Sequence, residues 1–233
     1  MFEGVFPLAT VKAEEVARLC LRLFQKDTGT NAIRLYDRVV NEKTLYREVS
    51  NRQHFDIEVS GGRLSWGGVK NYNLALIIAE NLDPASTELM LQLNSLTPLI
   101  VGRLYESKYE YWENAEDPLE FESEGRFLDG LPMKSNELPP PLEQMIVDTS
   151  GNPGRRILRN GYVEAVGHRM WLGPEFFRRV PASSRGAVLS ASWLRTSEIQ
   201  GGLLEVLAAN EPFCDRSTAE VQSRLRQLLF PDT

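Results

Sequence analysis

The sequence predicts an α+β fold with a mainly antiparallel sheet flanked by helices. Two observations predict this class. Segments in which apolar and polar residues alternate, as in half-buried strands, are interspersed with segments whose apolar residues recur at helical spacing. They follow no regular strand–helix–strand rhythm of the kind that builds parallel sheets. At 233 residues, 42% of them hydrophobic, the chain can bury a sizeable core in one large domain or two small ones.

The N-terminal segments predict one strand and two helices. Residues 2–9 alternate loosely and predict a short strand. Thr10 can cap a helix whose apolar spacing continues to Lys26. Residues 32–49 also have helix-compatible spacing, and we expect a second helix there.

The middle of the chain predicts a run of strands. Residues 55–59 and 63–66 alternate on either side of a glycine-containing turn, which is the pattern of a β-hairpin. The continuous apolar run within residues 73–80 predicts a central strand, because such a strand is buried on both faces. Residues 89–94 alternate and predict another strand, and residues 99–105 resume the pattern after a proline.

The C-terminal third predicts further strands and two short helices. Residues 162–166 and 168–172 predict strands, and Pro174 suits the first turn of a helix. Residues 187–194 predict a strand, whereas the periodicity of residues 203–209 fits a strand or a short helix equally well.

A proline- and glycine-rich stretch divides the chain. We expect an N-terminal α+β subdomain over residues 1–130, a crossover over residues 131–154 and a C-terminal α+β subdomain over residues 155–233.

Residues 217–220 have the spacing of a capping box and predict the start of a last helix.

The charge distribution restricts the partner. The net charge is −6, with −9 in residues 1–150 and +3 in residues 151–233. An acidic chain is a poor candidate for nucleic-acid binding, because phosphate contacts need a cationic face, and it suits a basic partner instead. The first residues lack the pattern of a signal peptide, and no apolar run approaches the ~20 residues of a membrane span. We therefore expect a cytoplasmic protein with neither a nucleic-acid nor a membrane partner.

The residues that usually carry chemistry form no recognisable site. Two histidines, His54 and His168, and two cysteines, Cys20 and Cys214, have no metal-ligand spacing, and no nucleophile or phosphate-binding motif is present. We expect no catalytic residue, cofactor or metal, a structural role for His168 with its ring nitrogens hydrogen-bonded, and a buried free thiol at Cys20. A pairing of Cys214 with a histidine has no local signature but stays open.

Two charged groups allow a functional interpretation beside a structural one. Asp56 and Glu58 share one face of a predicted strand, where paired carboxylates could bind Mg²⁺ or share acid–base roles, but alternating charge on a solvent face looks the same and is favoured. Arg155, Arg156 and Arg159 follow a glycine-rich turn and could bind an anion. The uneven charge favours an internal role for them, docking the acidic N-terminal part.

Residues 105–124 carry the strongest functional signal. They combine eight carboxylates and five aromatic rings with a single cation, Lys108. A surface that binds a basic partner uses both, because rings provide rigid contact area and carboxylates provide steering and charge-assisted hydrogen bonds. The alternative is a solvated helix in which Tyr105, Tyr109 and Trp112 face the core and the carboxylates face water. The candidate partner-binding residues are Glu110, Tyr111, Trp112, Glu113, Glu116, Asp117, Glu120, Glu122 and Glu124.

Several short motifs follow one another along the chain. They are G-V-F at 4–6, A-E-E-V-A-R-L-C-L-R-L-F at 13–24, Y-E-Y-W-E at 109–113, N-G-Y-V-E-A-V-G-H-R-M-W-L-G-P-E-F-F at 160–177 and R-L-R-Q-L-L-F-P at 224–231. These motifs and the order of the segments resemble bacterial immunity proteins of polymorphic and type VI secretion toxin systems, in particular the immunity protein 52 type. The match is poor over residues 128–154.

The resemblance implies a cytoplasmic antitoxin that binds and blocks a secreted toxin, such as a nuclease with a restriction-endonuclease-like domain. The carboxylates of the candidate site would then occupy the basic face of the toxin, and Tyr111 and Trp112 would anchor the complex. Two other classes stay open. One is an enzyme or small-ligand protein with a site between the two halves, built from Asp56, Glu58, the arginine cluster and His168. The other is a scaffold protein that assembles with itself.

Overall fold

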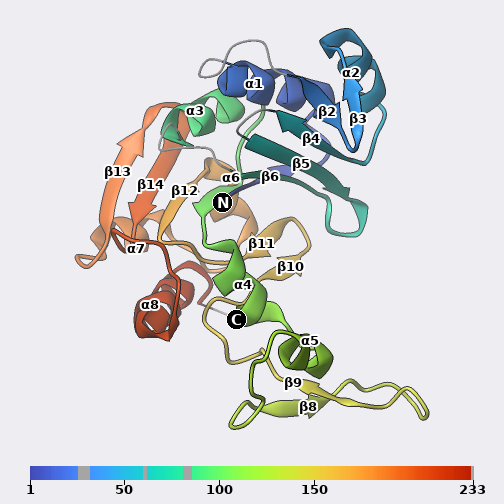
Figure 1. The fold of residues 1–233 in the computed structure, drawn as a ribbon. Coiled ribbons are helices and arrows are strands. Elements are labelled where there is room, and N and C mark those ends of the chain that lie inside the picture. Colours follow the sequence, from blue (N-terminus) through green and yellow to red (C-terminus); the bar gives the residue numbers. More distant parts are fainter. Residues whose placement is uncertain (26–31, 60–61, 81–85, 232–233) are drawn as a thin grey trace.

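The computed structural model describes residues 1–25, 32–59, 62–80 and 86–231 (Figure 1). It confirms the α+β class with a mainly antiparallel sheet. Ten strands form one sheet in the order β13-β14-β12-β7-β1-β6-β5-β4-β2-β3, and every neighbouring pair is antiparallel.

The N-terminal segments differ in part from expectation. The strand at residues 2–9 and the helix after it are confirmed, although Lys26 lies outside the described residues. The expected helix over residues 32–49 is wrong in its first half, where a hairpin buries the alternate residues Ile33 and Leu35. The elements are β1 (Phe2–Pro7), α1 (Ala13–Gln25), β2 (Ile33–Leu35), β3 (Arg38–Val40) and α2 (Glu42–Val49).

The middle of the chain forms the centre of the sheet. The predicted hairpin, the central strand and the strand before residue 105 are confirmed; part of the hairpin turn, residues 60–61, lies outside the described chain. The strand expected at residues 89–94 is wrong. A helix forms there, and it buries Leu89, Met90 and Leu93 on one face. The elements are β4 (His54–Val59), β5 (Gly62–Val69), β6 (Leu74–Glu80), α3 (Ser86–Leu96) and β7 (Val101–Leu104).

The C-terminal third completes the sheet and covers its second face. The strands at residues 162–172, the helix at Pro174 and the last helix are confirmed, and residues 203–209 contain a strand. The strand expected at residues 187–194 is wrong, because Ser184 caps a short helix there by accepting a hydrogen bond from the Ala187 amide. The elements are β10 (Ile157–Arg159), β11 (Tyr162–Glu164), β12 (Arg169–Leu172), α6 (Pro174–Arg179), α7 (Arg185–Ser190), β13 (Arg195–Ile199), β14 (Leu203–Leu207) and α8 (Ala219–Leu229).

The sheet has an apolar core on each face. Strand β1 shows this directly, because Phe6 joins the cluster that α1, α2 and α3 cover, whereas its neighbour Val5 joins the cluster that α6, α7 and α8 cover. Strands from both predicted subdomains share the sheet, since β12 pairs with β7. The division into subdomains stays a prediction.

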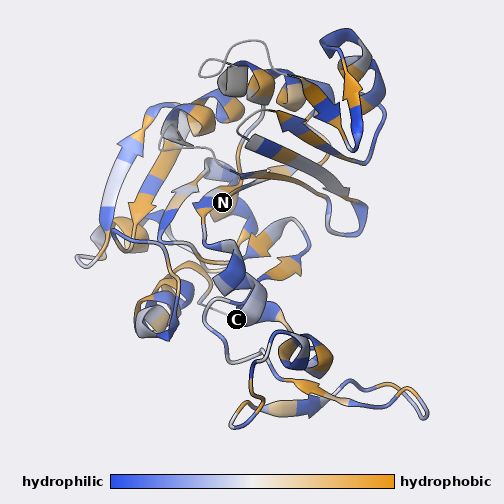
Figure 2. Cartoon of the chain, in the orientation of Figure 1, coloured by the Kyte–Doolittle hydropathy of each residue, from blue (hydrophilic) through white to orange (hydrophobic). Residues whose placement is uncertain are grey.

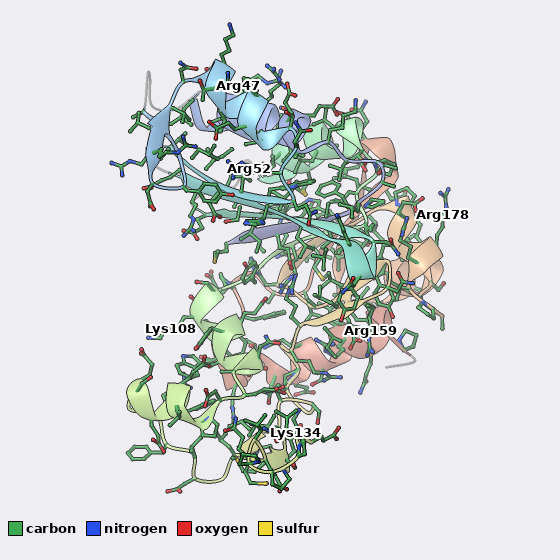
Figure 3. All side chains as sticks on the ribbon, turned by 90° about the vertical axis from the view of Figure 1, so that its right-hand side faces the viewer. Arg47, Arg52, Lys108, Lys134, Arg159 and Arg178 are labelled. Atoms are coloured by element: carbon green, nitrogen blue, oxygen red, sulfur yellow. The ribbon has the colours of Figure 1, made fainter. Side chains whose placement is uncertain are left out.

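Residues 105–148, which we call the acidic lobe, extend away from the sheet. The helix α5 and the hairpin β8–β9 project from the rest of the molecule in both views (Figures 1 and 3). The lobe has a small core of its own around Phe121 and Val147, against which Trp112 packs. Its elements are α4 (Ser107–Asn114), α5 (Pro118–Ser123), β8 (Met133–Ser135) and β9 (Met145–Val147). Nowhere in the described chain is a helix long and apolar enough to cross a membrane.

Candidate partner-binding site in the acidic lobe

The acidic lobe holds the excess negative charge of the molecule. Its sequence contains twelve carboxylates and three cations, a net charge of −9, whereas the rest of the chain has a net charge of +3. Figure 3 shows two of those cations, Lys108 and Lys134, at the lobe and the labelled Arg47 and Arg52 at the opposite end of the molecule. The negative charge of the protein is therefore concentrated in this lobe.

Apolar side chains are exposed on the same lobe. Among the described residues, seven of the ten large apolar side chains that are exposed belong to it, and Phe127 (86% exposed) and Leu119 (67% exposed) are the most open of them. Figure 2 shows hydrophobic segments on α5 and along the projecting hairpin. Exposed apolar groups gathered on one surface usually mark a protein interface. The seven residues are Tyr111, Leu119, Phe127, Met133, Leu138, Leu142 and Met145.

Two of the candidate carboxylates face inward. Glu110 accepts a bidentate pair of hydrogen bonds from Arg103, with 2.6 Å between Oε1 and Nη2. Glu113 is buried and accepts a hydrogen bond from the Gly154 amide at 2.9 Å. The expectation that these two side chains line the wet face of the helix is therefore wrong, because their partners, Arg103 of β7 and Gly154, lie in the body of the molecule. Both residues attach α4 to the body of the molecule.

A buried charge network lies beneath this attachment. Arg103 Nε donates to Glu3 Oε2 at 2.7 Å, and Arg156 Nη2 donates to Glu3 Oε1 at 2.6 Å. Burial alone would raise the pKa of Glu3, but the guanidinium groups of Arg103 and Arg156 lower it to about 2. Of the arginine cluster, Arg156 thus contacts the acidic N-terminal part, as expected.

The other arginines of the cluster also have internal partners. Arg155 and Arg159 pair with the buried carboxylate of Glu164 at 3.9 and 2.9 Å. Arg226 of α8 donates to the same carboxylate at 2.6 Å and to the Pro153 carbonyl oxygen at 3.0 Å. Because these guanidinium groups are committed to Glu164 and the turn backbone, the cluster acts as a structural joint beneath the lobe.

The outer carboxylates differ from Glu110 and Glu113. Glu116 accepts from Lys134 Nζ at 2.8 Å and from Thr149 Oγ1 at 3.2 Å, so it ties the hairpin to the segment between α4 and α5. Asp117 caps α5 by accepting from the Leu119 amide at 2.9 Å. These contacts leave both groups at the surface.

The end of α5 presents the most open charges. Glu122 and Glu124 are exposed, and Glu120 is half-buried beside Tyr111. A hydrogen bond to Glu120 raises the pKa of the exposed Tyr111 phenol. The phenol of Tyr111 on α4 therefore lies beside the carboxylates of α5 and its C-cap, and Leu119 is exposed on the same helix α5.

The aromatic rings divide between core and surface. Tyr105, Tyr109 and Trp112 are half-buried, as their helical spacing predicts, and Tyr109 Oη accepts from Gln222 Nε2 at 3.0 Å. Trp112 packs on Phe121 with ring centroids 4.9 Å apart. Trp112 is thus partly a core residue of the lobe, and Tyr111 is the exposed ring of α4.

A groove of about 380 Å³ runs between the lobe and the loop before α8. Its lining mixes rings, charges and the exposed free thiol of Cys214, whereas the side chain of Cys20 lies outside the described residues. The carboxylates of Asp148 and Asp215 on its rim already accept hydrogen bonds from backbone amides of their own loops. The groove therefore widens the candidate surface without forming a recognisable reaction site.

The residues of the enzyme alternative are far apart. Asp56 and Glu58 lie on β4, five strand positions from β12 and the adjacent His168, which is about 24 Å at the usual strand spacing. His168 is buried against Phe213, and burial lowers its pKa. Its Nδ1 has no hydrogen-bond partner among the described residues, contrary to expectation. The described residues also contain no cluster of three or more histidine, cysteine, aspartate or glutamate side chains that could hold a metal ion.

One part of the surface was missed by sequence reasoning. The exposed apolar residues Phe127, Leu138 and Leu142 lie in or beside the stretch whose proline content indicates a crossover. The available signal was the pair of leucines that flank three prolines at residues 139–141.

Comparisons with family models, curated proteins and solved structures find no match to this chain.

Proposed function

We propose that this chain is a cytoplasmic immunity protein that binds a basic toxin through the acidic lobe and blocks it without catalysis. One observation carries the proposal. A charge of −9 and seven exposed large apolar side chains are placed together on a lobe that projects from an otherwise well-covered fold. The resemblance to immunity proteins agrees with this arrangement.

The two kinds of side chain have separate roles in the proposed complex. The carboxylates at α5, chiefly the exposed Glu122 and Glu124 together with the half-buried Glu120, steer a cationic partner and raise the association rate. Tyr111 and Leu119 supply contact area that becomes buried in the complex and slows dissociation. Glu110 and Glu113 contribute indirectly, because they hold α4 in place.

The charge also disfavours self-assembly through this surface. Two copies that met lobe to lobe would bring a charge of −9 against a second charge of −9. A nucleic-acid partner is disfavoured for the same reason. The partner that complements the lobe is a protein with a basic face, and the basic active-site face of a nuclease toxin has this chemistry.

Co-purification with the product of the neighbouring gene, followed by growth rescue in cells that express that product, tests the proposal. We expect a stable complex and restored growth. The variant Glu120→Gln/Glu122→Gln/Glu124→Gln should associate at least about tenfold more slowly at low salt, since it removes three negative charges from the lobe. Its matched control, Glu58→Gln/Glu211→Gln/Glu220→Gln, changes three exposed carboxylates outside the lobe and should bind like the wild type.

Two results would contradict the proposal. Absence of both a complex and growth rescue would exclude an immunity role towards that product. Equal association rates for the two triple variants would show that the lobe charges do not steer the partner.

A further inference from the structure

We propose that the hairpin tip, residues 136–144 between β8 and β9, is a preorganised anchor that inserts into an apolar cleft with a basic rim on the protein partner. The inference rests on the proposed function and names the contact that holds the complex. The tip projects beyond β8 and β9 at the end of the lobe (Figure 1).

The backbone of the hairpin tip is fixed by one side chain. Asn136 Nδ2 donates to the Leu142 carbonyl oxygen at 2.9 Å, and its Oδ1 accepts from the amides of Leu138 and Gln144, both at 3.2 Å. The Asn136 amide also donates to the Gln144 carbonyl oxygen at 3.0 Å. Four hydrogen bonds therefore close the loop around Asn136, and the prolines at 139–141 restrict φ inside it.

The same loop turns its apolar side chains outward. Leu138 is 49% exposed and Leu142 is 65% exposed, one on each side of the three prolines. These two leucines belong to the group of exposed apolar side chains on the acidic lobe, and such groups mark protein interfaces. A rigid loop with exposed leucines loses little conformational entropy when it binds, so it is suited to insertion into a pocket.

The charge of the tip identifies the occupant of this surface. Residues 135–154 contain Glu137, Glu143 and Asp148 and no lysine or arginine. The two glutamates flank the leucines, so a complementary site has an apolar floor and lysine or arginine at its rim. An anionic membrane surface would repel these glutamates. A second copy of the chain would bring its own acidic lobe and be repelled as well.

The test compares the affinity of tip variants for the purified product of the neighbouring gene. Leu138→Ala/Leu142→Ala should weaken Kd about 100-fold, mainly through faster dissociation, because each leucine anchor contributes about tenfold. Asn136→Ala should weaken Kd about tenfold by loosening the loop while it leaves both leucines in place. The control Leu189→Ala changes a leucine of α7 that is 44% exposed and should leave Kd unchanged. All variants should keep the wild-type Tm within a few degrees, because the leucines are exposed or half-exposed and the hydrogen bonds of Asn136 lie within the projecting hairpin tip.

The outcomes separate the two proposals. If the wild type binds and the double leucine variant binds equally tightly, the hairpin tip is not the anchor, and the proposed function stands. If the wild type does not bind, the proposed function fails, and the anchor fails with it. If light scattering shows that the chain self-associates and the double variant does not, a second copy occupies the tip, which would overturn the proposal.

Discussion

Replacing Arg103 by methionine should be among the most destabilising changes in this protein. The Arg103 guanidinium is buried and contacts Glu3, Glu110 and the Val166 carbonyl oxygen. In Arg103→Met the side chain keeps a similar length but loses its charge. Glu3 then stays buried with Arg156 as its remaining cationic partner. Removing one member of a buried charge pair costs about 3–5 kcal/mol, a large part of the ~5–15 kcal/mol by which typical domains are stable.

The acid dependence of stability gives a second estimate of how much this network contributes to the free energy of unfolding. The pKa of Glu3 falls from 4.5 to about 2 on folding. At 1.36 kcal/mol per pKa unit, this shift corresponds to about 3 kcal/mol of stability. Since the folded pKa is the lower one, the contribution is complete above pH 4.5 and is lost as the pH falls towards 2. Glu3→Gln should lack this part of the acid dependence.

Urea denaturation at pH 7 and at several values down to pH 3 measures both effects. Arg63→Met is the control, because Arg63 is half-exposed and lies 3.6 Å from Asp56, a pair expected to contribute under about 1 kcal/mol. If Arg103→Met does not fold, Glu110→Gln tests the same network more gently. Equal urea midpoints for Arg103→Met and wild type would refute the reasoning, as would an unchanged acid dependence in Glu3→Gln.

Three further predictions concern the acidic lobe. Phe121→Ala removes the ring at the centre of the lobe core, so hydrogen exchange should accelerate over residues 111–148 while the sheet stays protected. Asp117→Ala should loosen α5 by about 1 kcal/mol, seen as faster exchange of its amides, whereas Asp117→Asn should keep the cap and lose only charge. Raising NaCl from about 50 to about 500 mM should strongly slow association with the partner, because salt screens the charges of the lobe. Dissociation should stay nearly unchanged in the same stopped-flow measurements. An association rate that is independent of salt would contradict the steering role of the lobe.

The spacing of apolar residues predicted strands correctly where it fitted a strand and not a helix. Strands β1, β4, β5 and β6 alternate or run continuously apolar, and the structure confirms them. Residues 89–94 and 187–194 fitted a period of two, but their leucines and neighbours also allow a helix face. Helix formation there depends on packing against α1 and α8, which no local window contains.

The acidic-aromatic segment was located correctly as a surface feature, but its inner and outer carboxylates could not be separated by sequence. Glu110 and Glu120 have similar local surroundings in the chain. Glu110 turns inward because Arg103 is buried beneath it, and the buried position of Arg103 depends in turn on Glu3, 100 positions away. The hairpin tip was missed because prolines predict irregular backbone, and only the structure shows that the Asn136 side chain hydrogen-bonds to this backbone on both sides of the prolines.

Hydrogen–deuterium exchange of the wild-type chain, alone and with the purified product of the neighbouring gene, tests the central claim most directly. The account predicts that the partner slows exchange within residues 105–148, most strongly at α5 and the hairpin tip, and leaves the helices α1 and α2 at the opposite end unchanged. A complex whose protection lies at α1 and α2, with exchange in the acidic lobe unaltered, would contradict it.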